Sequence, residues 1–311
     1  MTLFDTVAAE ATISELDAGN RVVDFTRWEK ISLPAASILL AYFLSCRHDI
    51  RDQVRCIFLR NSRLEQFLYR RQFFTTIAAS ARAPVWQLEV HVDREVPFRP
   101  PLGQRFTIFG RYPAMPFTPV AHARIHQSEE DFQAECGVLV GEIAKVFRAA
   151  AGLGGHEILA NARFILSNKE LIHNIYTHSG VAGYGALQVT TDSIFACYGD
   201  IGCGIHASLE PYRLRMGISD ADWTNPVAIL TAFEYGVTST LQGRGTGLPD
   251  TLQFVRDAGG FLQCRSGTTS LTFLPGRRQP LTRSVQALPG VQIALSLPVN
   301  RGERIENISF N

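Results

Sequence analysis

Three polar side chains recur at a spacing of four residues in the middle of the chain: Glu170, Asn174 and His178. Residues four apart lie on the same face of an α-helix, so this spacing places the three side chains on one stripe. A carboxylate and a carboxamide on a rigid helix suit a magnesium–phosphate site, because the amide oxygen is a hard ligand and the carboxylate can orient and deprotonate a nucleophile. A solvated helix face has the same spacing, and the stripe alone leaves both interpretations open.

A glycine-containing turn follows further along the chain, with Asp200, Gly202, Gly204 and Ile205 in close succession. Glycine lets the backbone approach a planar ligand closely, and a buried aspartate can accept a hydrogen bond from an exocyclic amine such as that of adenine. An ordinary tight turn, with the aspartate as a turn residue, is the structural alternative.

A third segment alternates glycine with other residues: Gly243, Arg244, Gly245, Thr246, Gly247 and Leu248. Such a loop exposes backbone N–H groups beside the positive N-terminus of a helix, which favours phosphate. Pro249 suits the first position of that helix. The segment is neither a P-loop, because Lys-Ser/Thr is missing, nor a dinucleotide fingerprint, because no strand leads into it. By itself it is also compatible with a flexible loop.

In this order and at these spacings, the three segments resemble the motifs of the GHKL (Bergerat-fold) ATPases. That family includes histidine kinases, anti-sigma serine kinases, gyrase, mismatch-repair proteins and heat-shock chaperones. Residues 170–174 match its N box, and the His178-Ser179 pair that follows is closest to the anti-sigma kinases. Residues 200–205 match its first glycine box, and residues 243–248 match its second.

This resemblance implies a site for ATP and Mg²⁺, in which Glu170 is the general base or water-orienting group and Asn174 is the magnesium ligand. Asp200 would bind the adenine amino group, with Gly202 and Gly204 giving access to it, and residues 206–242 would form a mobile lid. The residues expected to contact the nucleotide are Asn174, His178, Asp200, Gly202, Gly204, Ile205, Gly243, Arg244, Gly245, Thr246, Gly247 and Leu248.

One position departs from the family pattern. The last strand of the family usually begins with Gly-Thr, whereas this chain has Gly290 followed by Val291. A polar contact to the base is therefore in doubt, and Thr268 or Thr269 is a candidate substitute. His206 follows the first glycine box and is a further candidate contact, whereas His173 is expected to pack or to face solvent.

The hydrophobic pattern supplies a scaffold for these motifs. It predicts helices over residues 128–152, 156–178 and 250–258, and strands over residues 185–190, 194–198, 261–265, 270–274 and 291–298. The stretch between residue 198 and Gly247 is expected to be irregular. Two helices followed by paired strands indicate an α+β sandwich, with helices on one face of a mainly antiparallel sheet.

The N-terminal third has a different pattern, in which short apolar runs alternate with amphipathic ones. It predicts strands over residues 21–25, 54–59 and 87–92, and helices over residues 34–46 and 64–79, with Arg70 and Arg71 in solvent. Residues 22–40 resemble the strand-to-helix region of STAS domains, with Pro34 where the phosphorylated members carry serine. A generic α/β sandwich unrelated to STAS domains remains the alternative.

The predicted fold class is therefore α/β: an N-terminal STAS-like α/β domain followed by a C-terminal Bergerat-fold α+β sandwich. A proline-rich region contains the expected junction. We expect the STAS-like domain over residues 1–110, a linker over residues 111–127 and the ATP-binding domain over residues 128–311.

Composition limits the cell compartment and the partners. The formal net charge is +1, so no global field would recruit nucleic acid or an anionic membrane. The N-terminus lacks the features of a secretory signal, and the apolar stretch at residues 33–46 is too short to cross a bilayer. The 6 cysteines form no C-x-x-C pair, which indicates reduced side chains in a cytoplasmic protein.

The sequence thus predicts a cytoplasmic regulatory protein that binds Mg-ATP and acts as an ATPase or a Ser/Thr protein kinase. The expected partner is a protein, such as a STAS-like or sigma-type regulator, and a homodimer is compatible with this expectation. Two alternatives stay open: a non-catalytic interaction module that is nucleotide-switched or nucleotide-free, which Val291 favours, and a small enzyme that uses another glycine-loop cofactor.

Overall fold

The computed structural model describes residues 3–45, 54–58, 62–73, 76–77, 89–91, 107–109, 112–120, 157–179, 183–190, 193–238 and 245–298. It also describes residues 134, 136, 137, 140, 141, 143, 144 and 181. Within these residues the fold is mixed α/β with a large antiparallel sheet, as the hydrophobic pattern predicts. The described part of the chain contains no helix that is long and apolar enough to cross a membrane.

Among the described residues, six strands form the main sheet in the order β10-β11-β9-β8-β7-β6, and all neighbours are antiparallel. Its strands are β6 (Thr107–Phe109), β7 (Tyr112–Val120), β8 (Gly183–Val189), β9 (Ser193–Asp200), β10 (Phe261–Phe273) and β11 (Leu281–Pro298). The two short strands predicted over residues 261–274 are one strand, β10, whose pairing with β11 is irregular between Ser266 and Thr269. Strand β11 begins ten residues before the predicted start, at Leu281 instead of Val291.

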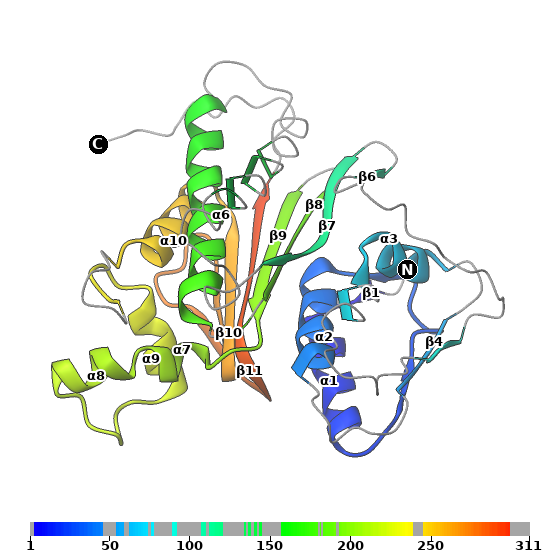
Figure 1. Cartoon of the computed structure of the whole chain (residues 1–311), viewed down its shortest axis with the longest axis horizontal. Helices are drawn as coiled ribbons and strands as arrows, with labels where there is room; N and C mark the ends of the chain where they lie inside the picture. Colours follow the sequence, from blue (N-terminus) through cyan, green and yellow to red (C-terminus); the bar gives the residue numbers. More distant parts are fainter. Residues whose placement is uncertain are drawn as a thin grey trace.

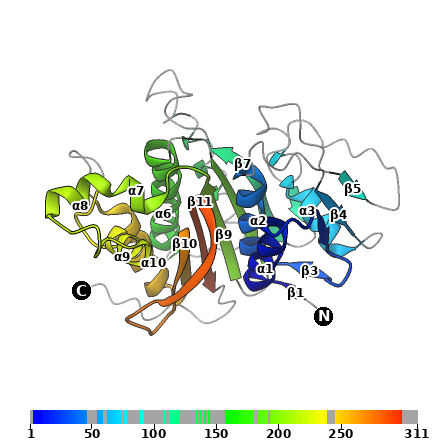
Figure 2. The ribbon, with the colours of Figure 1, turned by 90° about the horizontal axis from the view of Figure 1, so that it is seen from below.

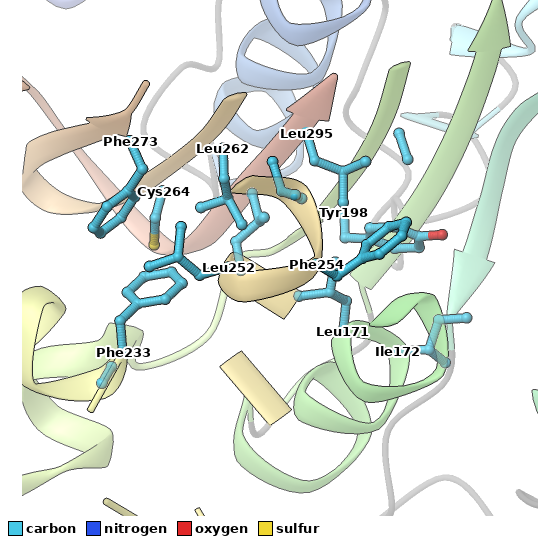
Figure 3. Close-up of a cluster of buried hydrophobic side chains, with 14 of the residues drawn as sticks. Leu171, Ile172, Tyr198, Phe233, Leu252, Phe254, Leu262, Cys264, Phe273 and Leu295 are labelled. Atoms are coloured by element: carbon cyan, nitrogen blue, oxygen red, sulfur yellow. The ribbon is translucent and has the colours of Figure 1, made fainter. Parts of the chain in front are cut away.

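The helices α6 (Glu157–His178) and α10 (Gly247–Asp257) lie on one face of this sheet, which we call the front face. The opposite face is the back face. Both helices match predicted helices closely. Leu171 on α6 and Leu252 on α10 pack against Tyr198 and Leu295 of the sheet in one buried cluster (Figure 3). Alternate residues of each strand enter this cluster because side chains alternate between the faces of a sheet.

The described part of the N-terminal unit contains short parallel strands and helices. The strands β2 (Val22–Asp24), β4 (Arg55–Ile57) and β5 (Glu89–His91) pair in parallel, as do β1 (Leu3–Phe4) and β3 (Lys30–Ile31). The helices are α1 (Thr6–Asp17), α2 (Leu33–Ser45) and α3 (Arg63–Arg70). The prediction lacked α1, although Asp5 caps it by accepting hydrogen bonds from two backbone N–H groups of its first turn.

The back face of the main sheet is covered by α1 and α2, so the sheet lies between two helical layers (Figures 1 and 2). Every residue from Leu33 to Phe43 is buried, since α2 packs on the main sheet and shares a core with the parallel sheet. From the main sheet, Tyr184, Ala186, Cys197, Leu288 and Ala294 join that core. The expectation of helices on only one face was wrong, because α1 and α2 come from the part of the chain assigned to a separate domain.

The segment expected to be a linker is also part of the main sheet. Residues 112–120 form β7, which pairs with β8, and β6 in the preceding residues pairs with β7. Proline is tolerated in β7 because this strand lies near the edge of the sheet, where the register shifts between Met115 and Thr118. The proline content therefore marks an irregular near-edge strand instead of a junction between independent domains.

Arg71 was expected in solvent, but its side chain is buried. Its guanidinium donates a hydrogen bond of 2.8 Å to the carbonyl of Leu187 on β8. Helix α3 ends at Arg70, earlier than predicted, and the positive φ of 57° at Gln72 turns the chain there. Because the arginine packs on the sheet from outside its own helix, the helical periodicity could not place it.

Candidate functional site

One cavity of about 450 Å³ collects most of the residues that the three sequence motifs singled out. Its size is within the range of small-molecule sites. The predicted residues that line it are Glu170, Asn174, His178, Asp200, Gly204, Ile205, Gly245, Thr246, Gly247 and Leu248. Gly202 is not in the lining, and Gly243 and Arg244 lie outside the described residues.

Helix α6 provides the polar wall of the cavity. Glu170, Asn174 and His178 are half-buried and share the stripe predicted from their spacing, while Leu171 and Ile175 beside them are buried against the sheet. Burial, with a smaller contribution from a second histidine nearby, lowers the pKa of His178, which favours its neutral form. The stripe therefore offers the cavity a carboxylate, an amide and a neutral imidazole.

Two other side chains of the cavity lining were not predicted to contribute to the site. His173 lines the cavity, although it was expected to pack or to face solvent. Tyr198 also lines it, and its hydroxyl donates to the side chain of Asn168, which is fully buried on α6. A sequence signal for Asn168 was missing, because its partner lies on β9, far away along the chain.

Asp200 ends β9 and is only 5% exposed. Its carboxylate accepts a hydrogen bond of 2.8 Å from the N–H of Gly202 and another from the backbone of Val291. Burial raises the pKa of Asp200 to about 6, and the two hydrogen bonds oppose that rise. At neutral pH the group is therefore mainly ionised and can accept further hydrogen bonds from a ligand.

The turn after β9 requires glycine for packing against α6. A Cβ on Gly202 would lie 1.8 Å from the carbonyl oxygen of Ser179, and the N–H of Cys203 donates to the same oxygen at 3.3 Å. Gly204 has a positive φ of 76° and lines the cavity. Gly202 is not in the cavity lining, and the structure gives this glycine another role: it lets the turn approach the end of α6.

The start of the predicted last strand, residues 290–292, lies directly behind Asp200. Gly290 has a φ of 76°, and a Cβ there would lie 2.1 Å from the carbonyl oxygen of Asp200. Val291 lines the cavity with its apolar side chain. Thr268 and Thr269 are absent from the lining, and Thr268 instead accepts a hydrogen bond from Asn225. Neither threonine therefore replaces the hydroxyl that the family usually has beside the aspartate.

The second glycine segment faces α6 across the cavity. Gly245 has a φ of 62° and accepts a hydrogen bond of 3.0 Å from the N–H of Gly236. A Cβ on Gly247 would lie 2.5 Å from a carboxylate oxygen of Glu170, so this glycine leaves room for that side chain. Gly247 begins α10, and the positive end of the helix dipole therefore lies beside the carboxylate.

The segment expected to be an irregular lid is largely helical. It contains α7 (Gly204–Ser208), α8 (Glu210–Met216) and α9 (Asn225–Ala232), and residues 239–244 lie outside the described part. Prolines in the first turns of α8 and α9 are a helix-start signal that the prediction missed. His206 does not line the cavity, since its ring contacts the carbonyl of Trp223 at 2.9 Å.

The cysteines of the described residues are free, and Cys56, Cys136, Cys197 and Cys264 are buried while Cys203 is exposed.

Comparison with known proteins adds no functional assignment: no family model, no curated protein and no solved structure matches the chain. The functional argument consequently depends on the geometry and chemistry of the cavity.

Proposed function

We propose that the cavity binds Mg-ATP in the manner of a Bergerat-type site and that the protein acts as an ATPase or a Ser/Thr protein kinase. The observation that carries this proposal is the convergence of three distant segments on one cavity: the α6 stripe, the buried Asp200 and the glycine segment at the start of α10. Each segment matches a different part of the same ligand.

The inner part of the cavity suits a purine base that carries an amino group. Asp200 provides a buried acceptor, and the apolar side chains around it can contact the faces of a planar ring. These side chains are Ile205, Val291 and Ile293. In this arrangement the exocyclic amine of adenine donates to the carboxylate, while its ring replaces water on the apolar wall.

The opposite part suits phosphate groups and a hard cation. The backbone of Gly245 and Gly247 lies at the start of α10, where the helix dipole favours anions. Within the described residues no group of three His, Cys, Asp or Glu side chains could hold a metal by itself. Mg²⁺ would therefore be held by the amide oxygen of Asn174 together with the phosphates, and it would supply charge neutralisation there.

Glu170 is the residue we assign to proton transfer. Its carboxylate lies beside Gly247 on the phosphate side of the cavity, where it can orient and deprotonate a hydroxyl. Transfer to water and transfer to a protein serine or threonine use the same general base, so both reactions remain part of the proposal. The N-terminal unit, which we infer to be STAS-like, provides a surface for a protein partner of this regulator.

A non-catalytic module is the second candidate, and the apolar Val291 beside Asp200 favours it. The nucleotide-switched form of the module predicts binding as the first candidate does, the nucleotide-free form predicts none, and only the first candidate predicts turnover. In the module, nucleotide would change the conformation of the chain or would be absent altogether.

Thermal-shift measurements with Mg-ATP test the nucleotide site, and phosphate release without any added protein tests the ATPase. We expect Mg-ATP to raise the Tm of the wild type, and Glu170→Gln to keep that shift while it loses at least about 100-fold in turnover. Glu15→Gln, the same chemical change at an exposed position on α1, should alter neither. Binding without phosphate release in the wild type would exclude the ATPase and leave the kinase and the module, and stabilisation by a dinucleotide but not by ATP would refute the Mg-ATP site.

A further inference from the structure

A row of side chains crosses the back face of the main sheet directly behind the cavity. Arg265 on β10 pairs with Gln292 on β11, Gln292 pairs with Gly199 on β9, and Gly199 pairs with Tyr184 on β8. Gly199 leaves the space that this row needs, because a Cβ there would lie 2.4 Å from the Tyr184 hydroxyl oxygen. Asp200, whose carboxylate lines the cavity, is the next residue along β9.

Arg265 connects this row to α1. The Arg265 side chain is 2% exposed, and its guanidinium donates to the two carboxylate oxygens of Glu10 at 2.8 and 3.2 Å. It also donates to the side-chain oxygen of Gln292 at 3.2 Å and to the carbonyl of Gln286. A buried guanidinium needs such compensation, so the position of α1 and the orientation of Gln292 are linked through this one side chain.

Gln292 connects the row to the cavity. Its side chain is buried, and its amide nitrogen donates to the carbonyl oxygens of Asp200 at 3.0 Å and of Pro289 at 3.1 Å. Arg265 holds the amide oxygen, which fixes the direction of the amide nitrogen toward Asp200. Asp200 is paired with Gly183 of β8 at the end of the ladder, and the contact from Gln292 adds a side-chain restraint on its carbonyl.

We infer that Gln292 is a positioning residue for Asp200 and that Arg265 and Glu10 make this positioning depend on the docking of α1. Docked α1 holds Arg265, which orients Gln292, which fixes the backbone that carries the Asp200 carboxylate. The preference of the cavity for an aminopurine then depends on the N-terminal unit. This last consequence rests on the proposed nucleotide site, whereas the positioning itself is a property of the free protein.

Two variants test the chain of contacts, Gln292→Leu and Glu10→Gln, and Tyr184→Phe is the matched control. Tyr184 lies in the same row and contacts Ser37 on α2, but it does not line the cavity. The first readout is the ratio of the affinities for ADP and inosine diphosphate, since only ADP carries the exocyclic amine. The second is hydrogen–deuterium exchange of the Gly202 and Val291 amides, which donate to the Asp200 carboxylate.

We expect Gln292→Leu to lower the ADP preference by about five- to tenfold, the effect of one misaligned hydrogen bond to a charged group. Glu10→Gln should lower it in the same direction, and Tyr184→Phe should leave it unchanged. In an Asp200→Asn background, Gln292→Leu should have no further effect on the ratio, because the group that it positions has been replaced. Exchange at both amides should increase in the first two variants only.

The outcomes distinguish a failure of the positioning role, of its link to α1 and of the proposed Mg-ATP site. If the wild type prefers ADP but Gln292→Leu changes neither the ratio nor the exchange more than Tyr184→Phe does, the positioning role is wrong. If Glu10→Gln changes neither readout while Gln292→Leu changes both, the link to α1 is wrong. If the wild type binds no nucleotide but both variants increase the exchange, the positioning stands and the Mg-ATP site fails.

Discussion

The raised pKa of Asp200 predicts that nucleotide affinity depends on pH in a defined direction. The carboxylate can accept a hydrogen bond from an amine, whereas the protonated acid offers a competing donor. With a pKa of about 6, roughly nine-tenths of the group is ionised at pH 7 and roughly one-tenth at pH 5. ADP affinity should therefore fall about tenfold between pH 7 and pH 5 from this group alone.

Isothermal titration calorimetry with Mg-ADP from pH 5 to pH 8 measures this dependence without turnover. The phosphates of the ligand also titrate near pH 6, so the wild type must be compared with Asp200→Asn, for which the ligand contribution is the same. We expect the ratio of the two affinities to rise with pH through about 6 and to level off above pH 7. Inosine diphosphate should lack this rise, because its 6-oxo group accepts hydrogen bonds and does not donate them.

Coincident pH profiles for the wild type and Asp200→Asn would refute the reasoning. That result would mean that Asp200 does not contact the base, whatever else the cavity binds. A wild-type ADP affinity that falls as pH rises would also contradict the proposal, since it would require the protonated acid to be the form that binds.

The same pKa gives a stability prediction of opposite sign. Folding raises the pKa of Asp200 from 3.8 to about 6, so the folded chain holds this proton more tightly than the unfolded chain. The resulting stabilisation is complete below pH 3.8 and is lost as pH rises to about 6. Its size is on the order of 3 kcal/mol. Urea unfolding at a series of pH values should show this loss in the wild type but not in Asp200→Asn.

Three further substitutions test the cavity and the turn that packs against the end of α6. Gly247→Ala places a Cβ 2.5 Å from a carboxylate oxygen of Glu170, so we expect calorimetry to show weaker Mg-ATP binding with little change in Tm. Gly202→Ala places a Cβ 1.8 Å from the carbonyl that ends α6, and it should lower the free energy of unfolding by about 1–3 kcal/mol. Gly141→Ala is the matched control, because a Cβ there meets nothing within 4 Å, and denaturant unfolding should show no loss. Asn174→Ala should remove the dependence of ATP affinity on Mg²⁺ while affinity in EDTA is retained, and equal loss in both conditions would contradict the assigned magnesium role.

The site motifs were predictable from the sequence because their geometry is local. The spacing of Glu170 and Asn174 fixes their shared helix face without knowledge of the rest of the fold. The positive φ angles of Gly204 and Gly245 are likewise local requirements that glycine meets. The packing role of Gly202 was not predictable in this way, since the atom that excludes a side chain there belongs to Ser179, which follows α6.

The arrangement of layers could not be predicted in the same way. Strand β7 and helices α1 and α2 come from parts of the chain that were assigned to a separate domain or to a linker, yet they complete the main sheet and its back layer. The burial of Arg71 and Arg265 depends on partners far away in the sequence, the Leu187 carbonyl and the Glu10 carboxylate. Periodicity reports which side of an element is apolar, but it does not report what packs there.

The pleat of β11 explains why the cavity and α1 depend on each other. Neighbouring residues of a strand face opposite sides of the sheet, so Val291 lines the cavity while Gln292 contacts Arg265, which in turn contacts Glu10 on α1. A strand cannot move one of these residues without the other, since a single peptide unit joins them. Both residues also hydrogen-bond Asp200, Val291 through its backbone to the carboxylate and Gln292 through its side chain to the carbonyl. A displacement of α1 that pulls Arg265 away would therefore be expected to change the orientation of this carboxylate, even though no residue of α1 lines the cavity.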